Sequence, residues 1–404
     1  MESHDPAAVA RRFPLLLAND GLVYLDNAAT THRLDSVLER ISRFYGTQNS
    51  NVHRGLYGLA AGATEAYEAA RVAVAHYIHA PSPEEIIFVR GTTEAINLVA
   101  SCWSRSFLRK GDEILTTAME HHSNFLPWIE AARTHGASLK VCSVGGDGEL
   151  DLEDLAKKLT PRTKLLAVTH VSNVLGTVNP ISKIVSMARQ VGAHVVVDGA
   201  KRMDGGPVDI ARLGCDFYAF SGHKMFAGMG IGVLYGRREL LERMPPYQLG
   251  GGMVERVSED DFNCRVLPEK FEAGTPNVAG AIGLHAALQF LETFPWEAHR
   301  AHGEKIRAYL ENALADLPGV RLFGCGRERA GIYSIACAAV HAHDLASMLA
   351  TKNICVRAGN HCAQPLLRHL QVPATLRASF SIYNTMEQAA AFVDCLRWAI
   401  GILG

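Results

Sequence analysis

Lys224 is the side chain of this sequence that is best placed for covalent chemistry. It ends the run Ser-Gly-His-Lys at 221–224, directly after the aromatic and apolar stretch 217–220, which is typical of a buried strand. The Gly-rich stretch 227–232 follows, where the backbone can approach a ligand closely. A lysine held on rigid structure in this way can form a covalent bond with the carbonyl group of a cofactor. The alternative is a solvated lysine at the end of a strand.

Asp198 ends a second predicted strand, the apolar run 195–197, and precedes Lys224 by 26 residues. Ligands in open α/β sheets bind beyond the carboxyl ends of the strands. A carboxylate at that position can pair with the protonated ring nitrogen of pyridoxal phosphate and strengthen the cofactor as an electron sink. The alternative is a helix-capping aspartate. Together, Asp198 and Lys224 favour a pyridoxal phosphate site at the ends of two neighbouring strands.

A helix start at 91–97, Gly-Thr-Thr-Glu-Ala-Ile-Asn, follows another predicted strand and suits an anion. The first turn of a helix leaves backbone N–H groups free, and the helix dipole favours negative charge there. The hydroxyls of Thr92 and Thr93 add donors, so we expect this turn to bind a phosphate group. The alternative is an ordinary helix start that is capped by a threonine and has Glu94 in its first turn.

His121 and His122 also follow a predicted strand, in the run 119–124. A neutral imidazole can stack on a cofactor ring and transfer protons near neutral pH. The alternative is a pair of surface histidines. Metal binding is a weaker interpretation, because no carboxylate or histidine lies at a helical spacing of four.

Cys362 lies in a short loop bounded by Gly359, with Arg357 and His361 close by in sequence. Cationic neighbours favour the thiolate form of a cysteine, and an exposed loop gives a substrate access to it. We therefore expect Cys362 to be a nucleophile. The alternative, an inert buried cysteine, fits Cys355 better, because Ile and Val flank it on a predicted strand.

Arg377 follows Cys362 by fifteen residues, in Leu-Arg-Ala-Ser at 376–379. A guanidinium group can hold a carboxylate through two parallel hydrogen bonds, so Arg377 is a candidate for binding a carboxylate substrate. The alternative is a surface arginine. Each candidate has an ordinary structural explanation when taken singly, but their order and their shared position after strands favour one active site.

The composition argues against several functional classes. The chain has 404 residues, 48% of them hydrophobic, and a formal net charge of -1, which predicts a globular protein and no nucleic-acid binding. No apolar run reaches the ~18 residues of a membrane span, and the first residues do not resemble a secretory signal. The nine cysteines are scattered without a CxxC pair, which argues against zinc and disulfide frameworks. We therefore expect no metal, no membrane and a cytoplasmic location.

Short apolar runs alternate with amphipathic stretches over most of the chain. The runs predict strands at 85–89, 113–116, 165–169, 194–197 and 232–235, and the stretches predict helices at 64–79, 123–134 and 181–190. Such an alternation implies an α/β fold with a mostly parallel sheet that is covered on both faces.

After about residue 280 the pattern changes to that of a smaller α+β domain. It predicts helices at 281–291, 296–317 and 386–403 and strands at 320–322 and 332–335. We expect an N-terminal arm at 1–20 that belongs to the small domain, a large cofactor-binding domain at 21–285 and a small domain at 286–404 that carries the Cys362 loop. Residues 250–253 and 258–261 are predicted to lie in an exposed loop.

In these candidate site residues and their order, the sequence resembles the NifS-like cysteine desulfurases of the class V aminotransferase family. More narrowly, it resembles their SUF-type (group II) branch. The resemblance runs from Tyr-Leu-Asp-Asn-Ala-Ala-Thr at 24–30 to Tyr-Asn-Thr at 383–385. Its most specific parts are 221–224, Arg-Ala-Gly-Asn-His-Cys-Ala at 357–363 and Phe-Glu-Ala-Gly-Thr-Pro-Asn at 271–277. The compact cysteine loop is typical of the SUF-type branch. The resemblance implies the pyridoxal phosphate-dependent transferase fold type I.

The resemblance implies roles in binding the cofactor. Lys224 would hold pyridoxal phosphate covalently and then move protons, Asp198 would pair with the pyridine nitrogen, and His121 would stack on the ring and act in catalysis. The other expected cofactor-binding residues are Thr92, Thr93, Asn173, Lys201, Ser221, His223 and Thr275. Thr275 would reach the phosphate of the other subunit, which implies a homodimer with shared sites.

The resemblance also implies a site for L-cysteine. Arg377 would bind its carboxylate, and Cys362 would attack its sulfur to leave a persulfide and alanine. The other expected substrate-binding residues are Asn173, Arg357, His53 and Arg54. A SufE- or SufU-like protein is expected to accept the sulfur.

One residue and one short stretch of this sequence depart from the family pattern. Lys201 stands where the family usually has a glutamine that donates a hydrogen bond to the phenolic oxygen of the cofactor. A lysine can still donate, but a second ammonium near Lys224 would favour the neutral amine or a more ionised phenolate. Residues 227–230, Ala-Gly-Met-Gly, stand where the family commonly has Gly-Pro-Thr-Gly.

The sequence therefore predicts a cysteine desulfurase that supplies persulfide sulfur, with iron–sulfur cluster assembly as the expected use. Within the same cofactor class, the alternative is a selenocysteine lyase or another class V enzyme, such as an aminotransferase, an epimerase or a β-lyase. An inactive scaffold or sulfur-relay subunit is the alternative of another class, and it rests only on Lys201.

Overall fold

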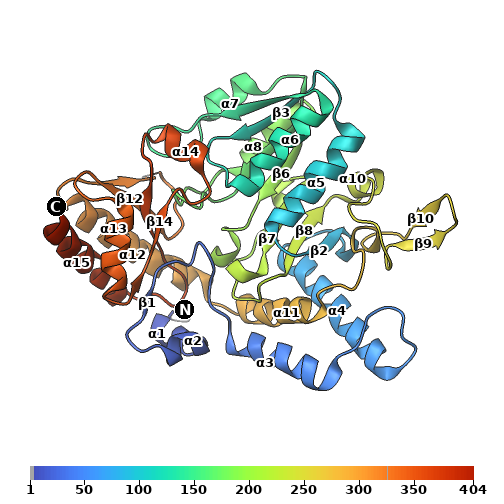
Figure 1. The fold of residues 1–404 in the computed structure, drawn as a ribbon, viewed down its shortest axis with the longest axis horizontal. Helices are drawn as coiled ribbons and strands as arrows, with labels where there is room; N and C mark the ends of the chain where they lie inside the picture. Colours follow the sequence, from blue (N-terminus) through green and yellow to red (C-terminus); the bar gives the residue numbers. More distant parts are fainter. Residues whose placement is uncertain (1–3, 325) are drawn as a thin grey trace.

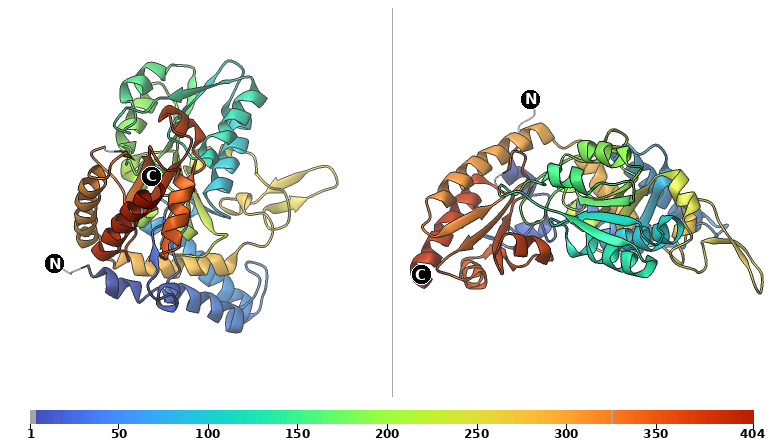
Figure 2. Two further views of the ribbon diagram at one scale, coloured as in Figure 1. Left: turned by 60° about the vertical axis from the view of Figure 1, so that its left-hand side comes forward. Right: turned by 90° about the horizontal axis from the view of Figure 1, so that it is seen from above.

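The computed structural model describes residues 4–324 and 326–404, which form a large α/β body and a smaller body beside it (Figure 1). The large body is built on a seven-stranded sheet and the smaller one on a four-stranded sheet. Figure 2 shows the two bodies side by side, with the C-terminal helix on the outer side of the smaller one. The predicted fold class, a mostly parallel α/β domain with a smaller α+β domain after it, is confirmed.

The strands of the large sheet lie in the order β2-β8-β7-β6-β5-β3-β4. They are β2 (Ile86–Val89), β3 (Glu113–Thr117), β4 (Ser138–Cys142), β5 (Thr163–Thr169), β6 (His194–Asp198), β7 (Phe217–Ser221) and β8 (Gly232–Gly236). All neighbours are parallel except β8, which runs antiparallel to β2 and β7. The sequence pattern missed only β4, an edge strand whose residues are mostly half-buried.

The strands are apolar on both faces because helices cover both faces. Ile86 and Phe88 point into one core, and Ile87 and Val89 point into the other. The helices of the first core are α3 (Asp35–Arg43), α4 (Gly58–Tyr77), α7 (Leu152–Lys158), α8 (Ile181–Gln190), α9 (Ile210–Leu213) and α11 (Val278–Glu292). Those of the second core are α5 (Thr92–Phe107), α6 (Leu126–His135) and α10 (Arg238–Arg243). Among the described residues, every helix falls short of the length or the apolar character that a membrane span requires.

The smaller body is an antiparallel sheet packed against helices. Its strands, in spatial order, are β11 (Val320–Phe323), β12 (Ile332–Cys337), β15 (Thr375–Ser379) and β14 (Arg357–Gly359). The helices that share its core are α12 (Trp296–Ala315), α13 (Ala342–Ala350) and α15 (Met386–Leu403). β14 leads directly into the loop that carries Cys362, and α14 (Gln364–His369) follows that loop.

The N-terminal segment contacts both bodies. β1 (Val23–Tyr24) pairs in parallel with β13 (Ile354–Cys355) of the smaller body. Before it, α1 (Pro6–Ala10) and α2 (Pro14–Ala18) flank Phe13. The Phe13 ring lies in the first core of the large body, against Phe226 and Tyr383.

Helix α11 crosses residue 286, where the sequence pattern divides the large domain from the small one. Ala286, Leu288 and Leu291 of this helix all pack in the first core of the large body. We therefore propose that the domain boundary lies in the turn at 293–295, between α11 and α12.

A hairpin projects from the large body at 254–264 (Figure 1). β9 (Val254–Val257) and β10 (Phe262–Cys264) pair antiparallel there, and residues 258–261 form the turn between them, as expected for an exposed loop. The sequence pattern did not indicate the two strands, because most of their side chains are exposed and no alternation of buried and exposed residues marks them.

Glu272 fastens the segment 271–277 to the large body. Its buried carboxylate accepts hydrogen bonds from the Tyr67 hydroxyl, the Arg71 guanidinium and the Phe88 N–H, at 2.7–2.9 Å. Arg71 is 2% exposed and lies over the rings of Tyr67 and Phe88. The carboxylate thus compensates a cation that has little access to water.

We expect Glu272→Ala to lower the free energy of unfolding by about 3–5 kcal/mol, because it leaves the buried Arg71 cation with only the more exposed Glu68 carboxylate, and the Phe88 N–H without its acceptor. Denaturant unfolding of the native and variant proteins measures the difference. Glu269→Ala is the matched control: its carboxylate is partly exposed and pairs with Arg265 at 3.7 Å, so a change below ~1 kcal/mol is expected. Equal stabilities of the two variants would contradict the role of Glu272.

Candidate active site

Most of the predicted site residues gather around one cavity of about 350 Å³. It lies at the carboxyl ends of β5, β6 and β7, with residues of β14, the Cys362 loop and β15 on its other side. The predicted residues that line it are Thr92, Thr93, His121, Asn173, Asp198, Lys201, Ser221, His223, Lys224, Arg357, Cys362 and Arg377. This is the edge of the sheet at which ligands bind in open α/β folds.

Lys224 and Asp198 reach the cavity from adjacent strands. Asp198 is the last residue of β6, in register with Ala219 of β7, and Lys224 ends the short 3-10 turn after β7. Burial lowers the pKa of the Lys224 amine to about 8, while Asp198 opposes this shift and Lys201 adds to it. An appreciable fraction of Lys224 is therefore uncharged near neutral pH, and this is the form that attacks a carbonyl group.

Asp198 is a buried carboxylate that faces the same cavity. Burial raises its pKa, whereas the hydrogen bond that Oδ1 accepts from the Ala200 N–H at 2.9 Å, and the charge of Lys224, lower it. A buried carboxylate of this kind needs a cationic partner, which a protonated ring nitrogen can supply.

The first turn of α5 offers groups that suit a phosphate at one end of the cavity. Its N-cap, Gly91, supplies no side-chain cap. Thr92 donates its N–H to the Ser221 Oγ at 2.8 Å, which holds that hydroxyl beside the helix start. A side chain at position 91 would meet the Ser221 Oγ at 3.2 Å, so glycine lets the two segments approach. Hydroxyls next to the positive end of a helix dipole favour an anion.

His121 lines the cavity in its neutral form. Burial, followed by the charge of Lys224, lowers the pKa of its ring to about 4. Its Nδ1 accepts a hydrogen bond from the Ser123 N–H at 3.1 Å, so the proton of the neutral ring lies on Nε2. The Ser123 hydroxyl also bonds the Thr93 Oγ1 at 2.7 Å and so connects the histidine to α5. Ser123 was not predicted as a site residue, although it follows His121 by two positions.

Cys362 lies in a strained loop. His361 and Cys362 both have positive φ, 51° and 54°, a conformation that costs roughly 1–3 kcal/mol for each residue other than glycine. The His122 N–H donates to the Cys362 carbonyl at 2.7 Å, and the Asn173 amide donates to the His361 carbonyl at 2.8 Å. The Cys362 N–H donates to the Asn360 Oδ1 at 3.0 Å. Among the described cysteines, Cys362 alone is exposed.

Arg357 and Arg377 stand opposite each other on β14 and β15 and share the carboxylate of Asp26. The Asp26 Oδ2 lies 2.8 Å from Nη2 of Arg357, and the Oδ1 lies 3.0 Å from Nη2 of Arg377. Burial lowers the pKa of Arg377, and Asp26 opposes that shift. Nε of Arg377 has no hydrogen-bond partner among the described residues, so this buried guanidinium has a donor left for a ligand. The sequence pattern gave Asp26 no role in the site.

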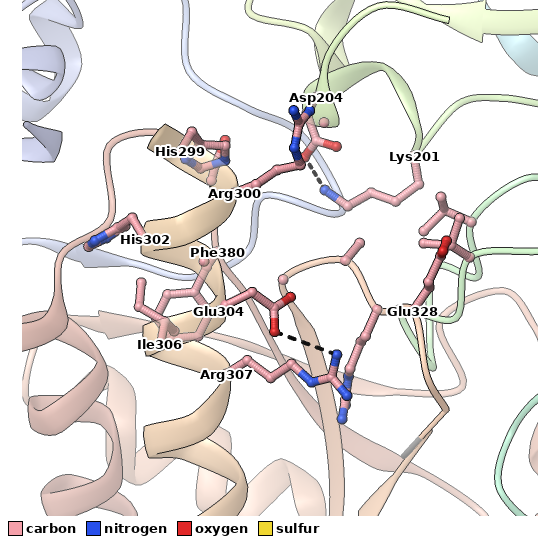
Figure 3. Close-up of a pocket in the computed structure, with 18 of the residues that line it drawn as sticks. Lys201, Asp204, His299, Arg300, His302, Glu304, Ile306, Arg307, Glu328 and Phe380 are labelled. Atoms are coloured by element: carbon pink, nitrogen blue, oxygen red, sulfur yellow. Dashed lines mark hydrogen bonds and ion pairs between the residues drawn. The ribbon is translucent and has the colours of Figure 1, made fainter. Parts of the chain in front are cut away.

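Lys201 lines the cavity, but its ammonium bonds the carboxylate of Asp204 (Figure 3). Both side chains are buried, and Asp204 follows Lys201 by three residues on the turn after β6. Asp204 was not predicted as a site residue. The charge of Lys201 is thus compensated within the protein.

His53, Arg54 and Thr275 lie outside this cavity in the single chain. They line a separate hollow of about 180 Å³ together with Arg265. His53 pairs there with Glu68 at 2.9 Å. Their assignment to a cofactor and substrate site stays a prediction, and it requires a second copy of the chain.

The sequence pattern of the family described as Aminotransferase class-V matches residues 23–392. The chain belongs to this family. It is 46% identical over 399 residues to a probable cysteine desulfurase of Halalkalibacterium halodurans, an alignment that covers 98% of this chain and 97% of that one. It is 43% identical over 396 residues to a cysteine desulfurase of Pectobacterium atrosepticum, with 97% of both chains covered.

Solved structures of cysteine desulfurases have the same fold. CsdA of Escherichia coli, in an S-sulfonic acid form, matches with a TM-score of 0.93 and 41% identity over 100% of both chains. The apo enzyme of Thermococcus onnurineus NA1 matches with a TM-score of 0.94 and 38% identity, again over 100% of both chains. The resemblance to cysteine desulfurases is thereby confirmed, and the narrower SUF-type branch stays a prediction.

We expect Asn360→Ala to lower the kcat for L-cysteine about five- to tenfold, because it removes a hydrogen bond of about 1 kcal/mol that holds the strained Cys362 loop. The visible absorbance of the bound cofactor should not change, since Asn360 does not line the cavity. Asn360→Ser keeps an oxygen acceptor two residues before Cys362 and should retain most of the activity. Equal kcat values for the native protein and both variants would contradict this restraint on the loop.

Proposed function

We propose that this protein is a pyridoxal phosphate-dependent cysteine desulfurase that converts L-cysteine to L-alanine and keeps the sulfur as a persulfide on Cys362. The observation that carries the proposal is a single cavity lined by Lys224, Asp198, Arg377 and the exposed Cys362. The first two suit a carbonyl cofactor with a basic ring nitrogen. The other two suit an amino acid that carries a carboxylate and a sulfur atom.

The residues present fit pyridoxal phosphate. The start of α5, with Thr92, Thr93 and Ser221, would hold the phosphate, and Asp198 would pair with the ring nitrogen. Lys224 would hold the cofactor covalently, and the neutral His121 ring would lie on it. When bound, the cofactor supplies an electron sink for the substrate amino acid.

The remaining chemistry is that of the protein's own side chains. Arg377 binds the substrate carboxylate with the donors that Asp26 and Asn173 leave open. The Cys362 thiolate forms a bond to the substrate sulfur while the carbon–sulfur bond of the substrate breaks. The electron pair of that broken bond stays with the carbon. A proton then converts that carbon to the methyl group of alanine. Lys224 is placed to deliver protons to the substrate because its pKa, about 8, lies near neutral pH.

The protein acts as a homodimer with shared sites in this proposal. His53, Arg54 and Thr275 lie together, but away from the Lys224 cavity of their own chain. This arrangement favours a role at the site of a second subunit, with Thr275 at its phosphate. A SufE- or SufU-like acceptor would take the persulfide sulfur for iron–sulfur cluster assembly in the cytoplasm, where cysteines without disulfide partners remain reduced.

Cys362→Ala is expected to abolish the formation of persulfide and to reduce alanine formation from L-cysteine by about 100-fold or more, because Cys362 is the only cysteine among the described residues that line the cavity. Alanine is measured by chromatography, and the persulfide by mass spectrometry of the protein. The visible absorbance of the cofactor should persist, which separates a loss of chemistry from a loss of cofactor.

Cys355→Ala is the matched control for that experiment. Cys355 lies on β13, and burial raises the pKa of its thiol, so its removal should leave alanine formation nearly unchanged. Full alanine formation by Cys362→Ala would favour another class V activity instead, such as a β-lyase. A purified native protein without cofactor absorbance would favour the scaffold alternative.

Lys201→Gln is expected to raise the pKa of Lys224, because the Lys201 cation contributes to lowering it. The uncharged amine attacks the cofactor, so the rate at which cofactor-free protein rebinds pyridoxal phosphate should rise with pH through a midpoint of about 8. That midpoint should lie at higher pH in Lys201→Gln and near the native value in Lys201→Arg, which keeps the cation. An unchanged or lower midpoint in Lys201→Gln would contradict this coupling.

A further inference from the structure

A second cavity of about 490 Å³ lies next to the active site, between the two bodies of the protein. Figure 3 shows Lys201 and Asp204 of the large body on one side of it and Arg300, Glu304 and Arg307 of α12 on the other. Lys201 and Val171 line both cavities, so the two cavities adjoin each other. Sites for metabolites have volumes of this size, roughly 300–1,000 Å³, and occur at domain interfaces.

The lining of this cavity has an excess of positive charge. Six basic side chains line it, against the three acidic ones of Asp204, Glu304 and Glu328. The basic ones are Lys201, Arg202, Arg300, Arg307, Arg327 and Arg329. Asp204 already pairs with Lys201, and Glu304 lies 3.8 Å from Arg307. Glu311, on the same helix, also pairs with Arg307 at 2.9 Å and lies 3.7 Å from Arg329. The excess positive charge therefore lies on Arg202, Arg300 and Arg327.

Three of the arginines have no carboxylate partner among the described residues. Arg202 donates only to the backbone carbonyls of Gly206 and Pro207, which fix its position without neutralising it. The side chains of Arg300 and Arg327 form no hydrogen bond or ion pair in the described part of the chain. Arg300 extends from α12 towards Lys201 and Asp204 (Figure 3).

The ring of His299, which lines the cavity, is affected by the positive charges around it. Burial and nearby cations, Arg300 and Lys201 among them, lower the pKa of His299 to about 3. The ring is therefore neutral at physiological pH and can donate or accept a hydrogen bond without adding charge.

We propose that this cavity is a second ligand site, which binds a small anion with two or more negative charges of the carboxylate or phosphate type. Guanidinium groups hold both kinds of anion through paired hydrogen bonds. The large body supplies Arg202, α12 supplies Arg300, and the segment before β12 supplies Arg327, so one bound anion contacts both bodies. The anion lies beside Lys201 and thus next to the active site.

Isothermal titration of the cofactor-loaded protein, in a buffer of low ionic strength, tests the proposal with citrate and pyrophosphate as probes. We expect at least one probe to bind saturably. The double variant Arg300→Gln/Arg327→Gln should bind that probe at least about tenfold more weakly than the native protein does. Both arginines are exposed and lie outside the cofactor cavity, so the variant should fold and retain its cofactor. Binding of citrate alone identifies a carboxylate site, and binding of pyrophosphate alone identifies a phosphate site.

Lys305→Gln is the matched control, because it removes one cation from an exposed position of α12 that does not line the cavity. Its affinity for the probe should equal the native value. The proposal is overturned if neither probe binds saturably, if the double variant binds as tightly as the native protein, or if Lys305→Gln weakens binding to the same extent. The titration requires no turnover, so its outcome is independent of the proposed desulfurase activity.

Discussion

The buried cation of Arg377 is the constraint on which the arrangement of the active site depends. A buried charge without a partner costs about 3–5 kcal/mol, and the carboxylate of Asp26 removes much of this cost. Asp26 also holds Arg357, the residue opposite Arg377 in the sheet. Because Asp26 follows β1, which pairs with β13, one carboxylate fixes the N-terminal segment against the two strands that flank the cysteine loop. Their relative positions decide where Cys362 lies.

The two bodies contribute different chemistry, and a shared apolar cluster together with hydrogen bonds sets the distance between them. The large sheet supplies Asp198 and Lys224 at its carboxyl edge, and the smaller body supplies Cys362 and Arg377. Asn173 bridges the two: its amide donates to the His361 carbonyl, and its own carbonyl accepts a hydrogen bond from Arg377. A strained loop that is held by such hydrogen bonds presents its sulfur in one position, at the cost of conformational energy that the surrounding packing must offset.

The sequence predicted those parts of the site that local patterns determine. Apolar runs that end in Asp198 and Lys224 indicate strand ends, and the carboxyl ends of adjacent parallel strands necessarily lie together. It did not predict Asp26, because its partner Arg377 lies 351 positions later and the pairing depends on tertiary structure. The sequence did not predict the pair of Lys201 and Asp204 for a different reason. This pair depends on a 3-10 turn, and no hydrophobic periodicity marks such a turn. The strands β9 and β10 were missed because most of their side chains are exposed, so no burial pattern marks them.

Lys201 shows how a departure from the family pattern can be accommodated. A second ammonium near Lys224 should repel its positive form strongly, and the sequence alone suggested a disturbed cofactor site for that reason. Asp204 changes this balance, because Lys201 lowers the pKa of Lys224 while Asp204 raises it. Two opposite charges in contact act at a distance as a dipole, whose field falls off faster than that of a single ion. The pair therefore resembles a neutral hydrogen-bonding side chain more than a free cation, and Lys224 keeps a pKa of about 8, close to the pH at which it must exchange protons.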